Sequence, residues 1–182
     1  LRLLVHSGQA RSVLVLCPKG LVSNWARVLS VWAPELVGGV SAGDPERRRW
    51  QWSLQDVPVK VAHYEAVIRD RPFLDEMRTK FDLVILDEAQ RIKNRASQTS
   101  KAVCSIPRKR SWALTGTPVE NRSEDLVGIF DFVAPGQVHD GMSPRVLGAA
   151  AKGHCLRRTK DKVLKDMPPR LDADRYIELS NE

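Results

Sequence analysis

Two adjacent carboxylates follow an apolar run in this chain. The segment Leu83 to Gln90 reads Leu-Val-Ile-Leu-Asp-Glu-Ala-Gln, so Asp87 and Glu88 come directly after residues typical of a buried strand. In open parallel sheets, ligands bind at the carboxyl ends of the strands. One carboxylate there can hold Mg²⁺ beside terminal phosphates, usually through water, while its neighbour orients the attacking water. We assign Asp87 to the metal and Glu88 to the water.

A second polar motif follows another expected strand. The segment 110–114 ends in Thr115-Gly116-Thr117-Pro118, where two hydroxyls around a glycine could bridge bound phosphates to a neighbouring element. Each motif alone has an ordinary explanation. An Asp-Glu pair can simply face solvent, and Thr-Gly-Thr-Pro is a common turn. The nucleotide hypothesis therefore depends on both motifs occurring together, in this order and at this separation.

The elements that must position these motifs alternate along the chain. We expect strands at 12–17, 57–62, 81–86, 110–114 and 171–179, and helices at 21–32, 65–80, 123–130 and 147–151. Apolar runs alternating with amphipathic segments predict an α/β fold, a parallel sheet flanked by helices on both faces. With 182 residues and 42% hydrophobic content, the chain can bury one sizeable core.

The composition favours a polyanionic partner. Lys and Arg number 29 against 22 Asp and Glu, for a formal net charge of +7. Basic surface releases counterions when it covers phosphates. The basic runs 47–49 and 108–110 are interpreted as solvated surface, with a DNA-facing role as the alternative.

The cysteines and the hydropathy pattern bear on the cellular setting. Cys17, Cys104 and Cys155 are widely separated and odd in number, which indicates neither a disulfide framework nor a zinc site. No apolar run approaches the roughly 20 residues that span a bilayer, so we expect no membrane partner. We expect an intracellular protein, cytoplasmic or at the nucleoid if the host is prokaryotic.

Several ordered motifs together resemble one family, the Swi/Snf branch of the superfamily-two helicase-like ATPases. They are Leu14 to Lys19, Tyr64-Glu65, Asp87 to Gln90, Thr115 to Pro118, and Arg157 to Val163. The resemblance covers nearly the whole chain. It implies an incomplete N-terminal RecA-like lobe over residues 1–170, with 171–182 starting the connection to a second lobe. Gln90 stands where many members carry His, which looks more like bacterial and archaeal members.

The resemblance implies ATP and Mg²⁺ as cofactors and double-stranded DNA as a partner, with protein bound to DNA as an open addition. Trp25 and Trp32 are expected in the core of their helix rather than on DNA. The implied site residues fall into three groups: catalytic Asp87, Glu88 and Gln90; hydrolysis-coupling Thr115, Gly116 and Thr117; and DNA-binding Pro18, Lys19, His63 and Tyr64.

The chain departs from the family pattern in two places. Members usually carry hydroxyl residues before Tyr-Glu, where this chain has Ala62 and His63. ATPases of this kind also need a Gly-Lys-Thr loop to cradle phosphates, and the sequence contains neither Gly-Lys-Thr nor Gly-Lys-Ser. We expect that loop upstream of Leu1, with residues 1–6 the tail of the helix that follows it. By itself the chain is then expected not to hydrolyse ATP.

Three functions are compatible with these residues. The first is a lobe of an ATP-driven motor that moves along double-stranded DNA. The second is a non-catalytic module that keeps the fold and only docks DNA or a partner protein. The third, an RNA-directed motor of the Asp-Glu-Ala-Asp kind, is disfavoured because those proteins usually show Ser-Ala-Thr in place of Thr-Gly-Thr and lack the Arg-Arg-Thr-Lys ending.

Overall fold

The computed structural model describes residues 1–36, 38–41, 43–116 and 123–158. Within these ranges the chain forms a five-stranded sheet in which every neighbouring pair is parallel, in the order β2-β3-β1-β4-β5. The strands are β1 (Val13–Cys17), β2 (Gly38–Ser41), β3 (Val59–His63), β4 (Phe81–Asp87) and β5 (Arg108–Leu114). The predicted parallel α/β fold is confirmed.

The strand order brings the ends of distant segments together. β1 lies in the middle, paired with β3 on one side and β4 on the other. In the register, Cys17 is opposite His63 and Leu16 is opposite Leu86. The segments that leave β1, β3 and β4 therefore start side by side, at the place where open parallel sheets bind ligands.

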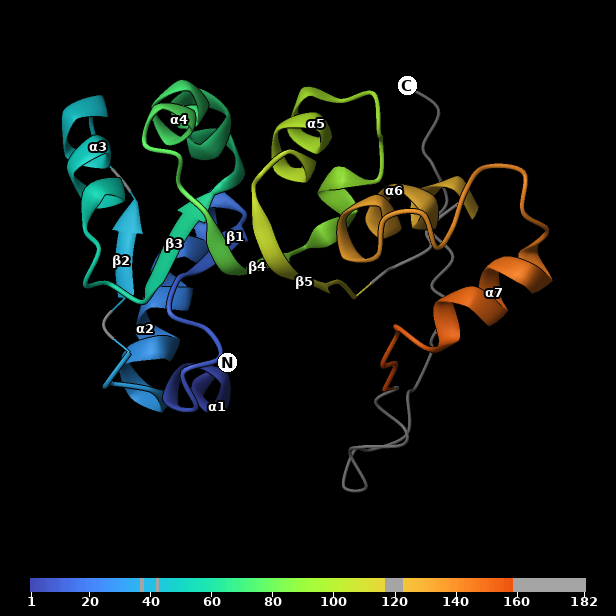
Figure 1. Cartoon of the computed structure of the whole chain (residues 1–182), viewed down its shortest axis with the longest axis horizontal. Coiled ribbons are helices and arrows are strands. Elements are labelled where there is room, and N and C mark those ends of the chain that lie inside the picture. The colour runs from blue at the N-terminus through green and yellow to red at the C-terminus, as the bar shows by residue number, and fades with distance from the viewer. Residues whose placement is uncertain (37, 42, 117–122, 159–182) are drawn as a thin grey trace, which may run out of the picture.

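Helices cover both faces of the sheet (Figure 1). One face carries α1 (Arg2–His6) and α2 (Val22–Trp32), and the other carries α3 (Pro45–Ser53), α4 (Tyr64–Glu76), α5 (Gln98–Cys104) and α6 (Ser123–Val133). α7 (Pro144–Lys152) packs beyond α6, and two 3₁₀ turns, η1 (Lys19–Leu21) and η2 (Ala89–Ile92), follow β1 and β4. Residues 1–6 were expected to be helical, and α1 agrees.

The sheet separates two apolar clusters. Leu14, Leu16, Val84 and Leu86 face the α4 and α5 side, and Val13, Val15, Leu83 and Ile85 face the α2 side. All five residues of β1 are buried, which is why its sequence is continuously apolar instead of alternating. None of the helices in the described residues is long and apolar enough to cross a membrane.

Three elements were not predicted, namely β2, α3 and α5. β2 is short and contains Gly38 and Gly39, and α5 is short and polar, so neither gives a clear periodic pattern. α3 begins with a usual N-terminal capping signal, since the Asp44 side chain accepts from the Arg47 N–H and Pro45 occupies the first turn. The expected strand at 171–179 and the expected connection at 171–182 lie outside the described residues.

Two expectations about single side chains are wrong. Trp32 was expected in the core of its helix but is 74% exposed, at the last residue of α2. The run 47–49 was interpreted as solvated surface, yet Arg48 is only 8% exposed. Its guanidinium forms two hydrogen bonds of 2.8 Å with the Asp70 carboxylate, so the charge is paired inside the protein.

Arg48, Asp70 and Trp52 join α3 to α4. The Trp52 indole donates to Asp70 at 2.9 Å, and Arg48 also donates to the Gly43 carbonyl at 2.7 Å. Burial raises the pKa of the Asp70 carboxyl, but the hydrogen bonds from Arg48 and Trp52 outweigh it, and the net pKa is lowered. Because the pKa is lower in the folded state, ionised Asp70 stabilises the fold at neutral pH. This stabilisation is lost as the pH falls through the folded-state pKa.

Replacing Asp70 with Asn should therefore destabilise the protein by about 3–5 kcal/mol at neutral pH, because it leaves Arg48 buried without a counter-charge. The loss should shrink in acid, where the wild-type carboxyl is itself protonated. Chemical denaturation at several pH values measures both effects. Asp75→Asn is the control: it breaks the exposed Arg71–Asp75 pair on the same helix and should cost little. Equal losses for the two variants would contradict this account.

Gly128 lets α6 approach the turn that follows the acidic motif. A Cβ placed on Gly128 would lie 2.2 Å from the Lys93 carbonyl oxygen, a backbone atom that cannot move aside. Gly148, in α7, is also helical, but a Cβ there meets nothing within 4 Å. The packing of α6 onto η2 therefore requires glycine at 128 and not at 148.

The substitutions Gly128→Ala and Gly148→Ala should change stability in opposite directions. The first should lower the unfolding free energy by about 1–3 kcal/mol through overpacking. The second should raise it by about 0.5–1 kcal/mol, since alanine favours a helix interior over glycine. Thermal unfolding of the two variants beside wild type decides the matter, and a neutral Gly128→Ala would show that the contact relaxes freely.

Candidate functional site

A pocket opens at the carboxyl ends of β4 and β5, and we name it the acidic pocket after Asp87 and Glu88, although Arg157 and Arg158 also line it. It has a volume of about 850 Å³. Asp87 is the last residue of β4, and Glu88 follows with φ 51° and ψ 53°. A left-handed backbone is uncommon for a residue other than glycine and concentrates at functional sites. The residues that line this acidic pocket include Asp87, Glu88, Leu114, Thr115, Gly116, Cys155, Arg157 and Arg158.

A chain of hydrogen bonds crosses the acidic pocket. The Gln90 amide nitrogen donates to Glu88 Oε2 at 2.7 Å, and the Thr115 hydroxyl donates to the Gln90 amide oxygen at 2.8 Å. A change at the Glu88 carboxylate can thus reach the segment after β5 through a single side chain. The structure places Glu88, Gln90 and Thr115 together, while Thr117 lies outside the described residues. Their roles in hydrolysis stay predictions.

Asp87 is held at three atoms. Its Oδ2 accepts from the Trp25 indole at 2.7 Å, its Oδ1 accepts from the Glu88 N–H at 3.0 Å, and its carbonyl accepts from the Tyr64 hydroxyl at 2.7 Å. Burial and the Asp87 charge raise the pKa of Tyr64, so the phenol remains protonated and keeps donating. The carboxylate is consequently fixed in orientation from two sides.

The donor set at Asp87 fits Mg²⁺ held mainly by water and phosphate. Mg²⁺ keeps several waters and usually takes only one or two carboxylates beside substrate phosphates. Each carboxylate oxygen of Asp87 already accepts one hydrogen bond and can accept a second from a metal-bound water. The described residues include no cluster of three or more His, Cys, Asp or Glu side chains that could hold a metal on its own.

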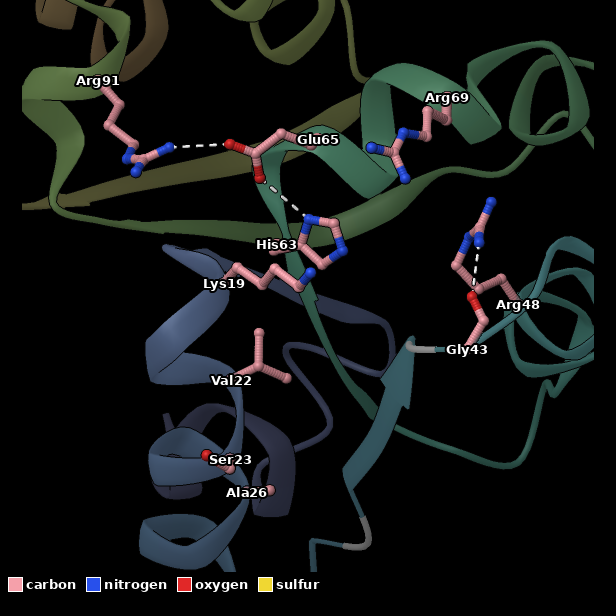
Figure 2. Close-up of a pocket in the computed structure, with 10 residues that line it drawn as sticks. All are labelled: Lys19, Val22, Ser23, Ala26, Gly43, Arg48, His63, Glu65, Arg69 and Arg91. Carbon is pink, nitrogen blue, oxygen red and sulfur yellow. Dashed lines mark hydrogen bonds and ion pairs between the residues drawn. The ribbon is translucent and has the colours of Figure 1, made fainter.

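A basic pocket of about 810 Å³ lies beside the ends of β1 and β3 (Figure 2). Lys19 reaches it from η1, His63 from the end of β3, Arg69 from α4, and Arg91 from η2. Its other lining residues are Val22, Ser23, Ala26, Gly43, Arg48 and Glu65. Figure 2 shows Glu65 between Arg91 and His63, with Lys19 and Arg69 on other sides of the cavity.

Most basic side chains of the basic pocket already lie against a carboxylate. Arg91 and His63 lie 3.0 Å from opposite oxygens of the Glu65 carboxylate, and Arg48 is paired with Asp70. In the part of the chain that the structure describes, no salt bridge involves Lys19 or Arg69. The pocket therefore keeps positive charge available for an anion.

The sequence predictions for the DNA side have mixed outcomes. Lys19 and His63 do line one pocket, with Pro18 directly before η1. Tyr64, also expected at DNA, is 0% exposed and its hydroxyl is bound to the Asp87 carbonyl, so its contact with DNA stays a prediction. A fully buried residue supports the site from inside.

Sequence reasoning missed Arg69 and Trp25. Arg69 follows Glu65 by four residues, a spacing that puts both on the same helix face, so the signal was present once the helix was predicted. Trp25 was expected in the core, and its ring does pack against the α2-side cluster. Its hydrogen bond to Asp87 joins residues that are 62 positions apart, which no local pattern reveals.

The parallel sheet with helices on both faces defines a class, a RecA-like α/β lobe. The family model of the SNF2-related domain matches residues 1–144, and the chain belongs to this family. The SWI2/SNF2 ATPase core of Sulfolobus solfataricus in complex with double-stranded DNA superposes with a TM-score of 0.78 at 30% sequence identity, over 91% of this chain and 38% of that one.

Relatives come from bacteria and eukaryotes. An uncharacterised ATP-dependent helicase of Mycoplasma genitalium is 33% identical over 93% of this chain and 18% of its own length. The TATA-binding protein-associated factor MOT1 of Saccharomyces cerevisiae is 29% identical over 92% of this chain and 10% of its own length. The chain thus spans less than a quarter of these relatives, and the similarity does not choose between bacterial, archaeal and eukaryotic members.

Proposed function

We propose that the protein carrying this chain is an ATP-dependent motor that moves along double-stranded DNA or remodels complexes on it. The observation that carries the proposal is the adjacency of two pockets at the same edge of the sheet, one that holds the Asp87-Glu88 pair and one lined mainly by basic side chains. The similarity to an ATP-dependent helicase and to an ATPase core in complex with duplex DNA supports it. Such work would place the protein inside the cell, at the nucleoid in a prokaryote.

The acidic pocket would carry the hydrolysis chemistry. Mg²⁺, when bound, would neutralise charge on the transferred phosphate. Asp87 would hold the waters of that ion, and Glu88 would orient the attacking water and accept its proton. Gln90 would pass the state of Glu88 to Thr115, and with it to Gly116 and Thr117. The left-handed backbone at Glu88 turns this residue away from the strand direction, into the pocket.

The basic pocket would hold the DNA backbone. Lys19, with Pro18 before it, and His63 would contact phosphates on one strand of the duplex. Such contacts position the protein without reading sequence, which suits a motor that must advance over any base pair. Because the charged groups gather where β1 and β3 end, a phosphate there lies close to the elements that hold Asp87.

Glu88→Gln should abolish DNA-stimulated ATP turnover in a protein that contains this chain together with its phosphate-binding loop. A general base contributes about 10²–10⁴-fold, so the rate should fall by at least about a hundredfold while nucleotide binding persists. Glu76→Gln, an exposed glutamate at the end of α4, is the matched control. Undiminished turnover in Glu88→Gln would remove the assignment, and a wild-type protein without turnover would favour the non-catalytic binding module.

Lys19→Ala should weaken duplex DNA binding equally for unrelated sequences. Loss of one phosphate contact should also reduce the slope of log K against log salt concentration by about 0.9. Fluorescence anisotropy with two duplexes of different sequence, over a range of salt concentrations, measures both effects. Lys101→Ala changes an exposed lysine on α5, away from the basic pocket, and should leave affinity and slope unaltered. The same slope for Lys19→Ala and wild type would exclude Lys19 as a phosphate ligand.

A further inference from the structure

The two pockets are connected through Asp87 by side chains that neither phosphate contact nor hydrolysis requires. The Trp25 indole N–H binds the Asp87 carboxylate at 2.7 Å, and the Tyr64 hydroxyl binds the Asp87 carbonyl at 2.7 Å. Trp25 belongs to the helix that follows Lys19, and Tyr64 comes directly after His63. Each residue thus belongs to a segment whose start lines the basic pocket.

Trp25 and Tyr64 differ in their freedom to move. Tyr64 is 0% exposed and lies in the main core cluster, so its bond to the Asp87 backbone is fixed. Trp25 is only partly buried, on a helix that the core holds mainly through Val22 and Leu29. A small displacement of α2 would therefore move the indole donor relative to Asp87 while the Asp87 backbone stays in place.

α2 is also the wall of the basic pocket. Val22, Ser23 and Ala26 line the cavity from this helix, and Lys19 lies in the turn that begins it (Figure 2). Trp25, between Ser23 and Ala26 in the sequence, points instead to Asp87. One helix thus lines the basic pocket with some residues and holds the Asp87 carboxylate with another. The indole N–H can only donate, so its partner must be a hydrogen-bond acceptor, here the Asp87 carboxylate.

We propose that Trp25 is a positioning residue through which occupation of the basic pocket by DNA phosphates orients the Asp87 carboxylate toward the metal-nucleotide. This inference rests on the proposed function. A phosphate bound at Lys19 attracts the turn that begins α2, and the displaced helix moves the Trp25 indole. The bond to Asp87 is charge-assisted and therefore stronger and more directional than a bond between neutral groups. Coupling of this kind is reciprocal, so the metal-nucleotide tightens DNA binding by the same factor.

The test compares Trp25→Phe with Trp52→Phe in an ATPase-competent protein that contains this chain. Both variants keep an aromatic ring and remove one indole–carboxylate bond, Trp25 from Asp87 and Trp52 from the buried Asp70. The readout is the ratio of duplex DNA affinities without and with Mg²⁺ and a non-hydrolysable ATP analogue. In Trp25→Phe this ratio should be smaller than in wild type by roughly fivefold or more, and so nearer to one. Trp52→Phe should lower thermal stability and leave the ratio as in wild type.

A second readout needs no nucleotide. The indole N–H resonance of Trp25, identified by its disappearance in Trp25→Phe, should shift when a short duplex DNA is added alone. An unchanged affinity ratio in Trp25→Phe would overturn the proposal. An equal change of the affinity ratio in Trp52→Phe would also overturn it, because it would indicate a general structural effect. A wild-type protein that shows neither DNA-stimulated turnover nor coupling would overturn the proposed function itself, and the wild-type measurement distinguishes that failure from the other two.

Discussion

The described fold depends on burying the central strands of a parallel sheet on both faces. β1 has no exposed residue, and β4 is buried except near its ends, so helices must cover each side. Parallel strands need a crossover between them, and with β1 in the middle the crossovers run outward in both directions. The carboxyl ends of β1, β3 and β4 are thereby forced together at one edge, where the polar segments follow.

That edge holds polar groups that satisfy one another. Glu88, Gln90 and Thr115 form one hydrogen-bonded chain, and Asp87 receives donors from α2, from α4 and from its own neighbour. Glu65 draws Arg91 and His63 together on the basic side. The site is therefore organised before any ligand binds, which reduces the reorganisation that charge development would otherwise require.

Burial also changes the chemistry of single groups around the site. Burial, assisted by the charge of Asp87, raises the pKa of Cys17 to about 12, so this thiol remains neutral and inert next to the acidic motif. Farther out, the Arg48–Asp70 pair ties α3 to α4 and holds the Gly43 carbonyl at the rim of the basic pocket. The arginine run that appeared to be surface thus contributes one residue to the interior.

The sequence determined the elements whose signal is local. Continuous apolar runs identified β1 and β4, helical spacing identified α2 and α4, and ordered motifs placed Asp87, Glu88, Lys19 and Thr115 at strand ends. It missed β2, α3 and α5, whose short or charge-rich segments carry little periodicity. The tertiary structure decided which strand ends are neighbours, that Tyr64 faces inward, that Arg48 meets Asp70, and that Trp25 reaches Asp87. Those contacts join residues far apart in the chain, and only the packing of the sheet and its helices sets such distances.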